Sequence, residues 1–106
     1  MDDARYEGPD EWMAAVHRAL ARADAHPILA AKGIDRETVL AVARREVSEA
    51  SDRGISILTH ARLARLTGMP RSTVLRARLA LTELGLEGLA SAPAAHGQVH
   101  RVLLHR

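Results

Sequence analysis

The chain contains neither cysteine nor phenylalanine, and it has one tryptophan, Trp12, and one tyrosine, Tyr6. Without cysteine, disulfide bonds and thiolate metal sites are excluded. Without phenylalanine, the core has to be built from Ala, Leu, Val and Ile, which favours closely packed helices over an aromatic-rich sandwich. No apolar run approaches the roughly 20 residues that span a membrane, and the acidic start has no apolar stretch of a secretory signal after it. We therefore expect a soluble, mainly helical, cytoplasmic protein.

The basic residues are almost all arginine, and they are unevenly distributed along the 106 residues. Residues 1–53 hold eight basic and eleven acidic side chains, a net charge of −3, whereas residues 54–106 hold seven arginines and two glutamates, a net charge of +5. This division indicates an acidic or neutral association element joined to a polyanion-binding module. Alternatively, the exposed arginines reflect only an arginine-rich composition, so charge alone does not decide for nucleic acid.

Two amphipathic helices are predicted in the first half of the chain. The first opens at Pro9 and runs to about Ala25, where Pro27 takes His26 out of helical geometry. Residues 28–32 add a short helical turn.

The second helix is followed by a short extended segment. Asp35 has the side chain of an N-cap, and the helix ends near Asp52, with Gly54 as a left-handed stop. Residues 55–58 are β-branched and alternating, which predicts a stub of strand.

Two helices separated by a tight turn are predicted over residues 59–85. Thr59 is placed to cap the first helix, and Gly68 is placed to end it. Pro70 fits the first turn of the second helix, which is about fourteen residues long and continues to Gly85.

A hairpin follows, with strands over residues 86–90 and 98–104 and a loop of roughly six residues. Helix, tight turn, longer helix and hairpin is the order of a winged helix-turn-helix. The stretch LARLTGMPRSTVLRARLALTELGL, residues 63–86, resembles the recognition unit of isocitrate-lyase-regulator-type repressors, and it is similar to the helix-turn-helix of plasmid and phage replication initiators. The stretch HGQVHRVLLHR, residues 96–106, falls where those families carry the second wing strand. Arg78 departs from the pattern, because these proteins usually carry an apolar residue there.

The resemblance implies a mainly α fold with a small β-hairpin, in which a winged helix-turn-helix is preceded by N-terminal helices. We expect residues 35–106 to form this domain and residues 1–34 to form a helical extension. The repressors also carry an effector-binding domain. Because the chain stops after the wing, we expect no small-molecule effector domain.

The resemblance also implies where DNA is contacted. Only the first two turns of a recognition helix reach base edges in the major groove, so they must present polar and cationic side chains. The preceding helix lies against phosphates, and the wing enters the minor groove or follows the backbone. We expect base contacts from Arg71, Ser72, Thr73 and Arg76, backbone contacts from Thr59, His60, Arg62, Arg65 and Arg78, and wing contacts from His96, Gln98, His100 and Arg101. Alternatively, Arg76 and Arg78 are solvated surface positions, and Ser72 and Thr73 only cap the helix.

One apolar helix face in the first half is larger than so small a module needs. It consists of Trp12, Met13, Val16 and Leu20, and a single helix-turn-helix reads only a short half-site. We therefore expect a homodimer that forms through this face. The alternative is that the helix folds back on its own domain.

Catalytic and metal-binding patterns are absent from the sequence. There is no Gly-rich phosphate loop, no Gly-x-Ser-x-Gly turn and no His-Glu-x-x-His helix. His96 and His100 fall on a predicted hairpin, and without cysteine they make a poor zinc site. We expect no metal, no cofactor and no enzymatic activity. The carboxylates of Glu46, Glu49 and Asp52 are interpreted as a solvated helix face with arginine neighbours.

These observations predict a sequence-specific double-stranded-DNA-binding protein associated with the nucleoid. It would be a small transcriptional regulator, or an accessory factor in plasmid or phage replication or partition. The alternative is a winged-helix protein–protein interaction module without specific DNA binding, in which the acidic N-terminal half docks a basic partner.

Overall fold

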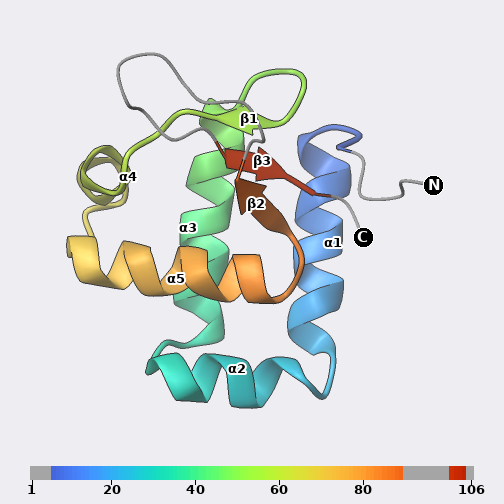
Figure 1. The fold of residues 1–106 in the computed structure, drawn as a ribbon, viewed down its shortest axis with the longest axis vertical. Coiled ribbons are helices and arrows are strands. Elements are labelled where there is room, and N and C mark those ends of the chain that lie inside the picture. Colours follow the sequence, from blue (N-terminus) through green and yellow to red (C-terminus); the bar gives the residue numbers. More distant parts are fainter. Residues whose placement is uncertain (1–5, 90–100, 105–106) are drawn as a thin grey trace.

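The computed structural model describes residues 6–89 and 101–104, which are mainly helical with a small antiparallel sheet (Figure 1). The predicted fold class is confirmed at this level. None of the helices in these residues has both the length and the apolar character needed to cross a bilayer. The elements are α1 (Pro9–Ala21), α2 (Ala25–Lys32), α3 (Arg36–Glu49), β1 (Ile55–Ser56), α4 (His60–Thr67), α5 (Arg71–Glu83), β2 (Glu87–Leu89) and β3 (Arg101–Leu103).

The three strands form one sheet in the order β1-β3-β2, and both neighbouring pairs are antiparallel. Glu87 of β2 stands opposite Leu103 of β3, as the predicted hairpin requires. Residues 90–100, which include the predicted loop of the hairpin, lie outside the described residues. β1 pairs with β3 through Ile55 opposite Val102, so the predicted stub is a full member of the sheet. Leu103 is fully buried, so its side of β3 faces the core.

The core lies between α1, α3, α5 and the sheet, and its buried hydrophobic residues are aliphatic apart from Trp12. α1 and α5 both pack against α3, which runs through the middle of the molecule (Figure 1). The indole N–H of Trp12 donates a 2.9 Å hydrogen bond to the Leu86 carbonyl, directly before β2. This bond satisfies the polar atom of a fully buried ring. It also joins the first helix to the start of the hairpin.

The first predicted helix is in fact two helices. α1 ends at Ala21, and α2 begins at Ala25, so His26 is helical. Pro27 stands in the first turn of α2, where a backbone N–H has no partner within the helix, and its ring is therefore tolerated.

α3 begins as predicted, with Asp35 accepting a hydrogen bond from the Thr38 backbone N–H at 2.8 Å. It ends at Glu49, slightly earlier than predicted. Gly54 lies in the turn that follows, with φ of 78°. A Cβ atom at Gly54 would lie 2.4 Å from Cγ of Tyr6. Glycine is therefore required there both by its backbone conformation and by the close approach of the ring.

The helices predicted as an N-terminal extension over residues 1–34 share this core within the described residues. α1 packs on α3, and α2 packs on α5. Lys32 at the end of α2 also forms an ion pair with Glu83 of α5. The predicted boundary at residue 34 therefore does not separate two cores.

The apolar face predicted to form a homodimer is covered within the single chain. Trp12 and Val16 have no exposed surface, Leu20 is 7% exposed, and Met13 packs at the edge of the same core. The prediction of a dimer through these four residues is wrong, because the chain's own helices already bury them.

Replacing Trp12 by phenylalanine is expected to lower the free energy of unfolding by about 2 kcal/mol, through the lost hydrogen bond and the space left by the smaller ring. Urea unfolding followed by circular dichroism measures the change, since Trp12 is the only indole fluorophore. His17 is exposed on the same helix, and His17→Ala should change the free energy by less than about 0.5 kcal/mol. Equal stability of Trp12→Phe and the parent chain would contradict the placement of α1.

Candidate nucleic-acid interface

A tight turn joins α4 to α5, and local signals determine both helix ends. Thr59 caps α4, since its hydroxyl oxygen accepts a hydrogen bond from the Arg62 backbone N–H at 3.0 Å. Gly68 ends α4 in the left-handed conformation, with φ of 73°. The sequence predicts Pro70 within the first turn of α5. In the structure Pro70 is the N-cap, one position before that turn begins. The predicted succession of helix, turn and longer helix is therefore confirmed.

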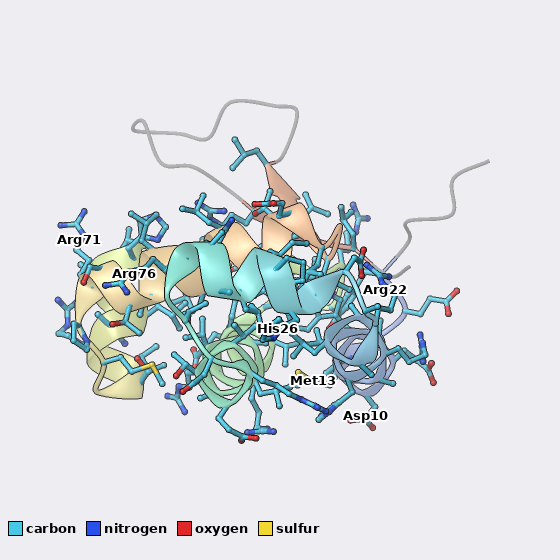
Figure 2. All side chains as sticks on the ribbon, turned by 90° about the horizontal axis from the view of Figure 1, so that it is seen from below. Asp10, Met13, Arg22, His26, Arg71 and Arg76 are labelled. Carbon is cyan, nitrogen blue, oxygen red and sulfur yellow. The ribbon has the colours of Figure 1, made fainter. Side chains whose placement is uncertain are left out.

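Four arginines are exposed on this pair of helices. They are Arg62 and Arg65 of α4 and Arg71 and Arg76 of α5, and together they are called the arginine surface below. Arg71 points away from the protein at the first turn of α5, and Arg76 lies beside α2 (Figure 2). No Asp or Glu occurs in residues 53–82. No carboxylate from α4 or from the first three turns of α5 therefore offsets the positive charge.

Arg76 makes one weak contact with the N-terminal helices. Its Nη1 donates to the Gly33 carbonyl at 3.4 Å, at the corner between α2 and α3. A hydrogen bond of this length is weak, and a guanidinium has five N–H donors. The remaining donors of Arg76 are therefore available to a ligand.

The predicted hydroxyl contacts differ in exposure. Ser72 is exposed in the first turn of α5, whereas Thr73 is half-buried. The hydroxyl of Thr59 is exposed but is used as the cap of α4. Among the residues predicted to contact bases, Arg71, Ser72 and Arg76 are therefore exposed, whereas Thr73 is only partly exposed.

Arg78, predicted to contact the DNA backbone, is buried instead. Its side chain is 2% exposed, and its Nε and Nη2 both donate to the carboxylate of Glu46 on α3, the Nε bond at 3.3 Å. Val74 and Leu81 are buried on the same side of α5. The prediction is wrong because this position belongs to the inner face of α5.

Three further side chains complete a polar cluster around Arg78, called the Arg78 cluster below. Nδ1 of His60 on α4 lies 3.1 Å from Nη1 of Arg78. Oε1 of Glu87 on β2 lies 4.0 Å from Nε of Arg78 and accepts a 3.1 Å hydrogen bond from Arg101 on β3. With Glu46, the cluster links α3, α4, α5, β2 and β3.

Two predicted DNA contacts belong to this cluster. Burial, and then the charge of Arg78, lower the pKa of His60, so the ring is neutral at pH 7 and accepts a hydrogen bond from Arg78. A neutral ring offers a phosphate no positive charge. Arg101, the wing residue, is half-buried and paired with Glu87. The other predicted wing residues, His96, Gln98 and His100, lie outside the described residues.

The two carboxyl groups of the Arg78 cluster have pKa values that are shifted in opposite directions. Burial opposes the charge of Glu46, but hydrogen bonds from Glu87 and Arg78 and the charge of Arg78 hold its pKa below the ordinary value. Burial, and then the charge of Glu46, raise the pKa of Glu87 well above the ordinary value. Two adjacent buried carboxylates do not both ionise readily. Glu46 is therefore the carboxyl group that favours its ionised form and balances Arg78, whereas Glu87 favours its protonated form.

The position of Glu46 corrects its interpretation as part of a solvated face. The signal for burial is present in the spacing, because Val39, Val42 and Glu46 follow one another on the inner side of α3. A charge within an apolar stripe indicates a buried partner.

Two exposed apolar residues of α5, Leu75 and Leu79, were also not singled out from the sequence.

The arrangement gathers guanidinium and hydroxyl donors on outer helix faces, which is chemistry suited to a phosphate-bearing ligand. Within residues 6–89 and 101–104, no three His, Asp or Glu side chains are grouped to hold a metal ion. Comparison of the chain with models of protein families, with curated proteins and with solved structures finds no match.

Replacing Arg78 by methionine is expected to lower the free energy of unfolding at pH 7 by about 3–5 kcal/mol, because it leaves ionised Glu46 buried without a cation. The loss should shrink as the pH falls toward about 4, because Glu46 of the folded variant, buried without a cation, takes up a proton above its ordinary pKa. Chemical unfolding followed by circular dichroism across this pH range measures both effects. A loss that does not change with pH would contradict the pairing of Arg78 with Glu46.

Replacing Glu87 by glutamine is expected to raise the free energy of unfolding at about pH 8. Above its ordinary pKa of 4.5, Glu87 ionises in the unfolded chain but keeps its proton in the folded chain. The free energy of unfolding therefore falls as the pH rises from there toward the folded pKa. Glutamine stays neutral in both states, and its amide N–H can donate to Glu46, so Glu87→Gln should match the parent near pH 4.5 and exceed it at about pH 8. A variant less stable than the parent at about pH 8 would mean that Glu87 is ionised in the folded chain.

Proposed function

We propose that the chain is a sequence-specific double-stranded-DNA-binding protein of the winged helix-turn-helix type, which reads the major groove with α5. The expected setting is transcriptional regulation, or the replication or partition of a plasmid or phage. The observation that carries the proposal is the arginine surface, which is exposed on α4 and on the first two turns of α5 with no acidic residue in residues 53–82.

The order of the elements supports the winged helix-turn-helix type. α3, β1, α4, α5, β2 and β3 follow one another along the chain, and β3 lies between β1 and β2 in the sheet. In this class a hairpin, the wing, follows the two helices that are joined by a tight turn, and the second of these helices enters the groove. α5 occupies that position in the chain.

The exposed residues of α4 and α5 suit different parts of a duplex. Arg62 and Arg65 are suited to phosphates, which add affinity without sequence preference. Arg71 and Arg76 lie within the first two turns of α5, the part of a recognition helix that reaches base edges, and an arginine can donate two hydrogen bonds to guanine. Ser72 offers a hydroxyl group to a phosphate or a base.

Replacing Arg62 or Arg65 by alanine is expected to weaken binding to all duplexes alike and to reduce the slope of log Kd against log salt concentration by about 1. Fluorescence anisotropy with a random-sequence duplex, titrated with sodium chloride, gives this slope. Arg18→Ala is the matched control, because Arg18 is exposed on α1 and the variant loses the same charge away from α4 and α5.

The outcome separates the two classes of function. A steep linear loss of affinity with salt, reduced by Arg62→Ala and Arg65→Ala but not by Arg18→Ala, is the result expected of a DNA-binding protein. A parent chain that binds no duplex at low salt would overturn the proposal in favour of a protein-interaction module.

Replacing Arg76 by alanine is expected to reduce the discrimination between a specific and a random duplex by about 1–3 kcal/mol. The specific duplex is obtained by selecting bound sequences from a random pool. Arg71→Ala is measured in the same assay, again with Arg18→Ala as the control. Unchanged discrimination in both α5 variants would mean that neither arginine reads a base.

A further inference from the structure

Two leucines on the outer face of α5 have no place in the core. Leu75 is 40% exposed and Leu79 is 48% exposed, whereas Val74, Ala77 and Leu81 of the same helix are buried. Ile57 and Leu89 are also exposed, at 57% and 65%, but Leu75 and Leu79 are the two that lie on the helix carrying Arg71 and Arg76. An apolar side chain of this size gains free energy when a ligand covers it.

The leucines share a stripe with the residues suited to DNA. Positions 72, 75, 76 and 79 are spaced by three and four, so Ser72, Leu75, Arg76 and Leu79 lie on one face of α5. A protein partner that covered Leu75 would also remove water from Arg76, which is costly unless the partner supplies a carboxylate. A duplex supplies phosphate and guanine acceptors for the arginine, and it supplies an apolar group for the leucine.

We propose that Leu75 contacts the C5-methyl group of a thymine in the major groove, beside the base pair read by Arg76. The inference rests on the proposed function. Thymine is suited to Leu75 because its methyl is the apolar group that base pairs present in the major groove. Leu75 and Arg76 are consecutive residues, so their side chains leave the helix about 100° apart and reach neighbouring positions along the groove. Leu79 lies beyond the first two turns and is assigned no base contact.

Uracil lacks only the methyl group of thymine, so exchanging one for the other isolates this contact. Each thymine of the duplex selected by the parent chain is replaced in turn by deoxyuridine, and Kd is measured by fluorescence anisotropy at fixed salt. One exchange is expected to weaken binding of the parent about fourfold, which corresponds to about 0.8 kcal/mol for one buried methyl-sized group. Leu75→Ala should bind the thymine and uracil duplexes equally, as a double-mutant cycle requires for a direct contact.

Leu79→Ala is the matched control, because it makes the same substitution at a similarly exposed leucine of the same helix. This variant should keep the fourfold preference for thymine. The proposal is overturned if no exchange to uracil weakens the parent, if Leu75→Ala keeps the preference, or if Leu79→Ala loses it equally. A parent chain that binds no duplex at low salt overturns the DNA-binding function itself, so the two failures are distinguishable.

Discussion

The ion pair between Arg78 and Glu46 determines how α5 is rotated about its axis. Both side chains are buried, and a guanidinium that turned toward water would leave Glu46 without a cation. Arg76 precedes Arg78 by two positions, which is about 200° around the helix. Arg76 therefore faces outward whenever Arg78 faces inward. The exposure of the residues proposed to read DNA thus depends on a contact on the opposite side of α5.

The N-terminal helices support the position of α5 and of the Arg78 cluster at two places. The Trp12 side chain of α1 bonds the carbonyl of Leu86, the residue before Glu87 of the Arg78 cluster. α2 packs along α5, with Lys32 paired to Glu83 and Gly33 contacting Arg76. The helices that sequence reasoning assigned to a separate extension therefore hold α5 and the start of the hairpin in position.

Three of the helix ends could be predicted from the sequence, because their capping signals act within a few residues. Asp35, Thr59 and Gly68 occupy the cap positions that their side chains or backbone predict. Arg78 and Glu46 could not be predicted as a pair in this way, because they are 32 positions apart. The apolar face of α1 indicates that Trp12 is covered, but whether by its own chain or by a second copy depends on the three-dimensional arrangement. On α5, the outward position of Arg71 and Arg76 agrees with the sequence prediction.

The contacts of Glu46 connect three positions of the chain. Glu46 balances Arg78, whereas burial, and then the charge of Glu46, raise the pKa of Glu87 well above its ordinary value. Loss of Arg78 or of Glu46 alone leaves the other as a buried charge without its partner. The three positions are therefore energetically coupled, so the effect of a substitution at one of them depends on which side chains occupy the other two.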